Sequence, residues 1–192
     1  MTKDHGSKML GLFKKALQDE EDWLQSTPPE KDREYERAIK SVRQLDEKWI
    51  QYLVVRQSLP DKDSPTVVTE TEGHHDFVFR AHGNGQNLAA FELKGPIYVD
   101  DHKPGDKLSE DIAKDCKKLA KNKKLGKVPK YVVLLPYGDE SEVREWLERS
   151  REKLPHVGPS GHPPPVRLKL NEIDKRGTRM LITLFEVRPG SG

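Results

Sequence analysis

The sequence predicts an α/β domain in which helices flank one central mixed β-sheet. Helical and strand-like patterns alternate along the chain in the order α, β-β-β, α, β, α, β-β. Segments rich in glycine and proline separate these patterns and mark the connections between them. A length of 192 residues is enough for one domain of ordinary size with its own core.

Helical patterns fill the chain before the first strand. Residues 7–25 are expected to form a short helix, because Met9, Leu10, Phe13, Leu17 and Leu24 lie roughly on one side of it. The run STPPEKD at 26–32 ends this helix and places prolines near the first turn of the next one. A long helix is expected from about Lys31 to Arg56, because apolar residues recur there at spacings of three and four.

Strand patterns follow the linker that ends at Pro65. The first three candidates are Thr66–Thr71, Asp76–Arg80 and Leu88–Lys94, and the segment GPIYVDDHKPGDK after them is expected to be a loop. The run KYVVLLPYG at 130–138 has the composition of a buried strand. The chain closes with VRLKLNEID and TRMLITLFEV, which are expected to form a hairpin turning at Lys175-Arg176-Gly177.

Two more helices are expected among these strands. One runs from about Leu108 to Asn122, and the other from Asp139 to Lys153 with Asp139 or Ser141 as its cap. The Pro/Gly-rich segment 156–165 connects the second helix to the last hairpin.

The predicted organisation is one domain with an added N-terminal helix. Residues 1–30 are interpreted as an N-terminal helical extension and residues 31–192 as a single domain. Within that domain, residues 31–138 form the core and residues 139–188 supply the C-terminal helix and hairpin.

Composition excludes several classes of function. The net charge is only +2, so a surface for nucleic acid requires local clustering of basic residues. Cys116 is the only cysteine, which excludes an intramolecular disulfide and a zinc site made of thiolates. No stretch approaches the roughly 20 apolar residues of a membrane span, and the N-terminus lacks the apolar region of a signal peptide. We therefore expect a cytoplasmic protein without a membrane partner.

The segment HHDFVFRAHGNGQNLAAFELKG contains a predicted hairpin with an unusual pair of acids. Gly83-Asn84-Gly85 is a turn signal between two strand patterns. A hairpin centred on Asn84 opposes Asp76 to Glu92, Val78 to Ala90 and Arg80 to Leu88. The same alternation directs Phe77, Phe79, Phe91 and Leu93 to the other side, into a core.

Opposed carboxylates predict a bound cation at this hairpin. Directly opposed β-carbons lie about 4.5–5.5 Å apart, where like charges destabilise a sheet. A divalent ion such as Mg²⁺, which takes oxygen ligands, would make the encounter of Asp76 and Glu92 favourable. Lys94 projects to the same place and would orient the attacking water. Two acids and an ammonium around a cation are the groups that hydrolyse a phosphodiester.

Asp76-Phe77-Val78-Phe79, followed by Glu92-Leu93-Lys94 on the next strand, resembles the PD-(D/E)xK nuclease superfamily, which has the restriction-endonuclease-like fold. The similarity extends to the order of elements over residues 31–138, although His75 stands where the motif has proline. The resemblance implies a nuclease dependent on Mg²⁺ or Mn²⁺ that acts on DNA, with RNA as the alternative substrate. It also implies a homodimer, formed through the first helix or the C-terminal hairpin.

The resemblance further implies a role for each site residue. Asp76, Glu92 and the Leu93 carbonyl would hold the metal, and Lys94 would serve the attacking water. An acid from the preceding helix often assists in this superfamily. Asp46 is the candidate, because it lies inside the apolar stripe of the long helix, and Glu47 is the reserve. The next helix often adds a polar or basic residue, for which Lys114 or Lys118 is available.

A second signal is a basic run that follows this motif. Residues 112–130 hold eight lysines and one acid, Asp115. A helix that buries Ile112, Cys116 and Leu119 directs four lysines outward, where they could neutralise DNA phosphates. These candidate nucleic-acid-binding residues are Lys114, Lys117, Lys118 and Lys121.

Other interpretations remain open on the sequence alone. The hairpin can be an amphipathic one whose polar face meets water, and the lysine run can be a solvated helix face. In that case the protein is a catalytically silent module that binds nucleic acid or protein on the same fold, or an interaction protein whose charged helices engage another chain.

Overall fold

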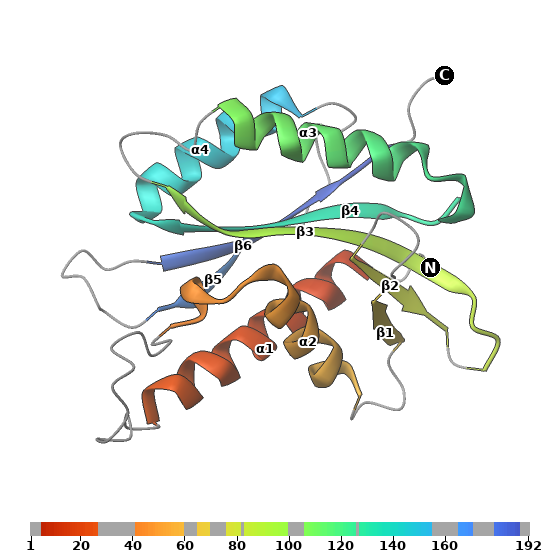
Figure 1. Cartoon of the computed structure of the whole chain (residues 1–192), viewed down its shortest axis with the longest axis horizontal. Helices are drawn as coiled ribbons and strands as arrows, with labels where there is room; N and C mark the ends of the chain where they lie inside the picture. The colour runs from red at the N-terminus through yellow and green to blue at the C-terminus, as the bar shows by residue number, and fades with distance from the viewer. Residues whose placement is uncertain are drawn as a thin grey trace.

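The computed structural model describes residues 5–26, 41–59, 65–69, 76–81, 83–99, 106–125, 127–154, 165–170 and 179–188. These residues form a mixed six-stranded sheet with helices on both faces, so the predicted α/β class is confirmed (Figure 1). The strand order is β1-β2-β3-β4-β6-β5. The strands are β1 (Thr66–Thr69), β2 (Phe77–Arg80), β3 (Asn87–Val99), β4 (Lys130–Gly138), β5 (Val166–Lys169) and β6 (Arg179–Glu186).

The sheet contains one parallel pair, β3 with β4, and its other pairs are antiparallel. The predicted register of the β2–β3 hairpin is confirmed at Val78, which pairs with Ala90. Arg80 pairs with Asn87 and not with Leu88, as we had expected, because a bulge interrupts the register just before Arg80. The side chains predicted to point into one core do so, and Phe77, Phe79, Phe91 and Leu93 are fully buried there.

Strand β3 is longer than the sequence pattern predicts. The segment after Lys94 was expected to be a loop, but β3 continues to Val99 beside β4, with an irregularity between Lys94 and Ile97. Gly95 lies in this irregularity with φ of 129°, and an added Cβ would come within 2.9 Å of the Leu135 Cβ. Only glycine meets both conditions without strain.

One face of the sheet is covered by α1 (His5–Ser26), the short 3₁₀ helix η1 (Val42–Gln44) and α2 (Glu47–Ser58). The helix predicted over residues 7–25 is thus confirmed. The continuous helix predicted from Lys31 to Arg56 is wrong at residues 41–46, while residues 31–40 lie outside the described part of the chain.

The break before α2 has a clear cause in its hydrogen bonds. The buried Glu21 carboxylate of α1 accepts hydrogen bonds from the Ser41 hydroxyl (2.9 Å) and the Val42 amide (2.8 Å), which holds η1 against α1. Asp46 has extended backbone angles, and its side chain accepts from the Trp49 amide at 2.8 Å. Asp46 is therefore the N-cap at which α2 begins.

The other face is covered by α3 (Asp106–Lys121), the 3₁₀ turn η2 (Lys123–Leu125) and α4 (Glu140–Lys153). Both α-helices match the predicted ones, and Asp139 caps α4 as expected. Lys130 is buried and donates to the carbonyls of Ala120 (3.3 Å) and Asn122 (3.1 Å) at the end of α3. This lysine occupies carbonyls that the helix itself leaves unpaired.

The C-terminal hairpin is confirmed as an antiparallel pair, in which Leu168 of β5 lies opposite Met180 of β6. Its predicted turn at 175–177 lies outside the described residues, as do most of the connection at 156–165 and the predicted boundary at residue 30. Within the described residues, no helix is long and apolar enough to span a membrane.

Candidate active site

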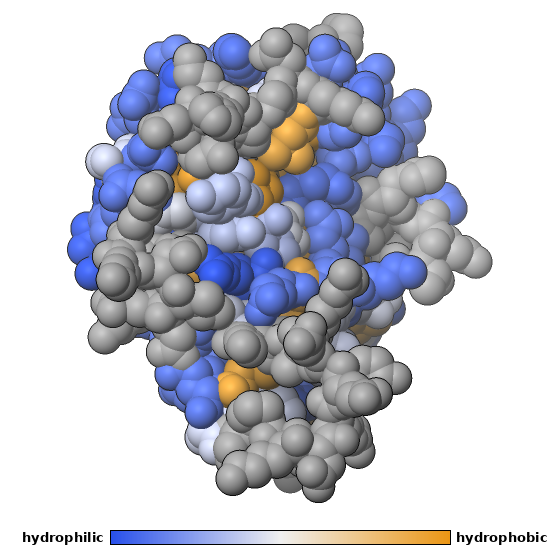
Figure 2. Space-filling view, turned by 60° about the vertical axis from the view of Figure 1, so that its left-hand side comes forward, coloured by the Kyte–Doolittle hydropathy of each residue, from blue (hydrophilic) through white to orange (hydrophobic). Residues whose placement is uncertain are grey.

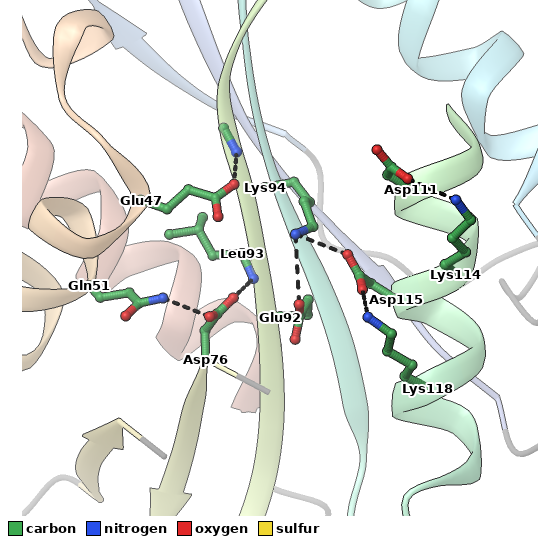
Figure 3. Close-up of polar contacts among 11 residues, drawn as sticks. Glu47, Gln51, Asp76, Glu92, Leu93, Lys94, Asp111, Lys114, Asp115 and Lys118 are labelled. Atoms are coloured by element: carbon green, nitrogen blue, oxygen red, sulfur yellow. Dashed lines mark hydrogen bonds and ion pairs between the residues drawn. The ribbon is translucent and has the colours of Figure 1, made fainter. Parts of the chain in front are cut away.

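The candidate site lies where strands β2 and β3 separate. Strand β2 begins at Phe77, and within the described residues the last backbone hydrogen bond between the two strands runs from the Asp76 amide to the Phe91 carbonyl at 3.0 Å. No described strand pairs with β3 on this side from Glu92 to Val99. Helices α2 and α3 pack against β3 from opposite faces. Polar side chains therefore meet along an edge of β3 between the two helices (Figure 3).

Asp76 is fixed by two short hydrogen bonds. One carboxylate oxygen accepts from the Gln51 side chain of α2, and the other accepts from the Leu93 amide, both at 2.6 Å. Burial raises the pKa of Asp76, and the hydrogen bond from Leu93 opposes that rise. Asp76 and Glu92 are therefore not the directly opposed strand pair that we had expected. They lie on either side of the β3 edge, with Asp76 toward α2 and Glu92 toward α3 (Figure 3).

Glu92 carries the most perturbed carboxyl group of this site. Its side chain is only 12% exposed, and its Oε2 is buried without a hydrogen-bond partner. Burial, followed by the nearby negative charge of Asp76, raises the pKa of Glu92 to about 8. A buried polar atom without a partner costs free energy, so this oxygen requires either a proton or a cation.

Lys94 lies on the same side of β3 and is held by a residue of α3. Its ammonium is 2.9 Å from Oδ2 of Asp115 and 3.8 Å from Oε1 of Glu92. Burial acts to lower the pKa of Lys94, but the hydrogen bond to Asp115 and the surrounding carboxylates raise it overall. The other Asp115 oxygen is 2.9 Å from Lys118. Although burial opposes the change, the two lysines lower the pKa of Asp115.

The acid that α2 contributes is Glu47. Its Oε1 accepts from the Gly95 amide at 3.0 Å, next to Lys94. Burial raises the pKa of Glu47, the Gly95 hydrogen bond and Lys94 lower it, and Asp76 raises it further. The structure thus brings the reserve residue into the cluster, while the carboxylate of Asp46 caps the helix.

Two residues of the cluster, Gln51 and Asp115, were not singled out as site residues from the sequence. Gln51 follows Glu47 by one helical turn, so the two side chains emerge on the same side of α2. Asp115 lies three residues after Ile112 and four before Leu119, both buried, which directs it toward the sheet. The sequence shows on which side of their helices Gln51 and Asp115 lie, but only the packing shows which residues these side chains contact.

The four lysines of α3, namely Lys114, Lys117, Lys118 and Lys121, are exposed as predicted. Lys114 pairs with Asp111 at 3.1 Å and Lys118 with Asp115, so part of the positive charge is already neutralised within the helix. Of the two lysines proposed as contributors to the site, Lys118 reaches it through Asp115.

The donor set fits a hard divalent cation with few protein ligands. Among the described residues, no group of three or more His, Cys, Asp or Glu side chains is placed to hold a metal ion. Mg²⁺ in phosphate-processing sites uses one or two carboxylates and completes its shell with water and substrate oxygens. Asp76 and Glu92 are the two carboxylates available for such an ion, and Oε2 of Glu92 is a buried oxygen without a hydrogen-bond partner.

Compared with known proteins, the chain matches no family model, no curated protein sequence and no solved structure. The residues of the site and their chemistry therefore carry the functional argument.

Proposed function

We propose that the chain is a metal-dependent nuclease of the PD-(D/E)xK type, which hydrolyses phosphodiester bonds of DNA at the open edge of β3. The observation that carries this proposal is the buried, unpartnered Oε2 of Glu92, a carboxylate whose other oxygen lies 3.8 Å from the Lys94 ammonium and whose pKa the charge of Asp76 helps to raise. Carboxyl groups whose pKa is raised by burial and by a nearby like charge are common in active sites. A hairpin with only a structural role has no need to bury a carboxylate oxygen without a hydrogen-bond partner.

Asp76 and Glu92, with the Leu93 carbonyl, are the groups that would hold Mg²⁺ or Mn²⁺. Such an ion would neutralise charge on the phosphate. It would also lower the pKa of a bound water, so that hydroxide becomes available at neutral pH. Asp76 is held in place for this role by Gln51 and by the Leu93 amide. Glu92 must lose its proton when a cation binds, because its pKa is about 8 in the structure.

Lys94 acts as a charged donor in this proposal and not as a general base. Its pKa is raised above 10.5, so the ammonium keeps its proton at neutral pH. It would therefore orient the attacking water or stabilise charge that develops on the phosphate. Asp115 is a positioning residue for Lys94, since their 2.9 Å contact fixes the end of a flexible side chain.

The lysines of α3 support DNA as the substrate. Lys117 and Lys121 are exposed on α3, the helix that also holds Asp115 beside Lys94. Phosphate contacts by such residues supply affinity independent of sequence and position the duplex. As the resemblance implies, the products would carry a 3′-hydroxyl and a 5′-phosphate.

Cleavage of plasmid and linear DNA tests this proposal. The parent protein, Glu92→Ala and Lys94→Ala are incubated with and without Mg²⁺ or Mn²⁺, with Glu148→Ala and Lys153→Ala on the exposed face of α4 as matched controls. We expect cutting that requires metal, is lost in both site variants and persists in both controls. Cutting that survives both site variants would refute the proposal. Salt-sensitive DNA binding without cutting would instead support the catalytically silent module.

A further inference from the structure

Two tyrosines lie side by side on β3 and β4, beyond the part of β3 that carries the site. Tyr98 of β3 is 54% exposed, and its ring centroid is 5.3 Å from that of Tyr137 on β4. The two residues are direct partners in the parallel β3–β4 register. Tyr137 is half-buried and packs on the core that α1 and α2 share with the sheet. The half-buried ring of Tyr137 thus anchors the exposed ring of Tyr98 on a rigid part of the fold.

The exposed Tyr98 lies on the strand that also carries the candidate active site. Tyr98 follows Lys94 by four residues on the same strand, a span of at most about 13 Å at ~3.3 Å per residue. No described strand covers the β2 side of β3 between them. At the B-form rise of ~3.4 Å per nucleotide, this span corresponds to about four nucleotides, and to fewer in an extended strand.

The surroundings of the pair suit a nucleic acid strand. Arg43 belongs to η1, which packs against β3. Burial raises the pKa of Tyr137, and the positive charge of Arg43 opposes that rise, which places a cation near the rings. The C-terminal ends of β3 and β4 come forward in Figure 2, where weakly polar surface in the middle of the face has hydrophobic residues along its upper margin and hydrophilic residues below it.

We propose that Tyr98, supported by Tyr137, is a stacking subsite for an unpaired base, so that the preferred substrate is DNA with a single-stranded segment beside the cut phosphate. This inference rests on the proposed nuclease function. An exposed aromatic ring binds bases of any sequence through their faces. Bases inside a duplex already stack on both faces, so only a frayed, flapped or single-stranded segment offers a free base to Tyr98.

The chain offers a matched control in Tyr52. This residue of α2 is 53% exposed, and its ring lies 5.5 Å from that of Trp49. The guanidinium of Arg56 lies 5.9 Å above the Tyr52 ring, so one of its faces is already in contact with a side chain. Tyr52 therefore resembles Tyr98 in exposure and ring pairing but does not belong to the β3 edge.

Binding to labelled oligonucleotides in EDTA tests the subsite without cleavage. We expect Tyr98→Ala to weaken binding of single-stranded DNA about 5- to 150-fold, the range for loss of one stacked base. Tyr98→Phe, which keeps the ring, should bind like the parent, as should Tyr52→Ala. Binding of blunt duplex should be unchanged in all three variants. Equal single-strand binding by the parent and Tyr98→Ala would overturn the inference.

Cleavage separates failure of this inference from failure of the proposed function. With Mg²⁺ or Mn²⁺, we expect the parent to cut a duplex with a single-stranded flap faster than a blunt duplex, and Tyr98→Ala to lose that preference. If the parent cuts both equally and Tyr98→Ala changes nothing, the subsite is wrong and the nuclease stands. If the parent cuts no DNA, the proposed function fails and this substrate preference fails with it.

Discussion

Replacing Glu92 with Gln should stabilise the metal-free protein at neutral and alkaline pH, although it removes a residue that we place in the active site. Burial and the charge of Asp76 raise the pKa of Glu92 to about 8, whereas the ordinary value is 4.5. The folded protein therefore binds this proton more tightly than the unfolded chain does. Glutamine resembles the protonated form, so it avoids the cost of burying a negative charge beside Asp76.

The sign of the effect follows from proton linkage. Between pH 4.5 and about 8 the unfolded chain loses the Glu92 proton first, so stability falls as pH rises through this window. At 1.36 kcal/mol per pKa unit, the shift corresponds to about 3 kcal/mol at pH 7 and about 5 kcal/mol at pH 9. The raised pKa values of Asp76 and Glu47 act in the same direction. The lowered pKa of Asp115 makes stability depend on pH only in acid. The raised pKa of Lys94 does so only above pH 10.5.

Urea unfolding in EDTA from pH 5 to pH 9 measures this contribution. The parent should lose several kcal/mol of stability over the range, while Glu92→Gln should match the parent to within about 1 kcal/mol near pH 5 and exceed it by about 4 to 5 kcal/mol at pH 9. The exposed Glu148→Gln on α4 is the matched control and should follow the parent. Parallel curves for the parent and Glu92→Gln would refute the assigned environment of Glu92.

Two further predictions concern the helix α3. Asp115→Asn should lower kcat about 10- to 100-fold while DNA binding is retained, and should move the alkaline limb of the pH–rate profile to lower pH, because Asp115 raises the pKa of Lys94. Combined Lys117→Ala and Lys121→Ala substitution should reduce the slope of log binding constant against log salt by about 0.9 for each lysine that contacts a phosphate.

Each of these predictions has a control on an exposed surface. Asp111→Asn removes an acid that pairs only with Lys114 among the contacts described for α3, so an equal loss of kcat there would contradict the role of Asp115. Lys153→Ala on α4 removes the same charge away from the site. An unchanged salt slope in the α3 double variant would exclude these lysines as phosphate contacts.

Local sequence patterns predicted most of the elements because those patterns depend on neighbouring residues. The glycine-flanked turn and the strand alternation were enough to pair Val78 with Ala90. The extension of β3 was missed because Gly95-Pro96 reads as a strand end. Pairing with β4 overrides that local signal, and this partner lies more than 30 residues along the chain.

The site was predicted in outline and corrected in detail. Asp76, Glu92 and Lys94 lie along one edge of β3, with Asp76 toward α2 and Glu92 toward α3, but the acid from α2 is Glu47 and not Asp46. The apolar stripe around position 46 predicted a continuous helix, whereas Glu21 of α1 holds Ser41 and Val42 at η1 and Asp46 caps the start of α2. The contact of Asp115 could not be predicted from local patterns, because its partner Lys94 belongs to a separate element, strand β3.

Calorimetric titration of the metal-free protein with Mn²⁺ at pH 7 measures whether Asp76 and Glu92 bind a divalent cation. In buffers of different ionisation enthalpy, we expect one bound Mn²⁺ per chain and release of roughly 0.9 proton, because a carboxyl with a pKa of about 8 is mostly protonated at pH 7. Glu92→Gln should abolish both. Mn²⁺ binding that is absent from the parent, or that persists without proton release in Glu92→Gln, would contradict a cation site at Asp76 and Glu92.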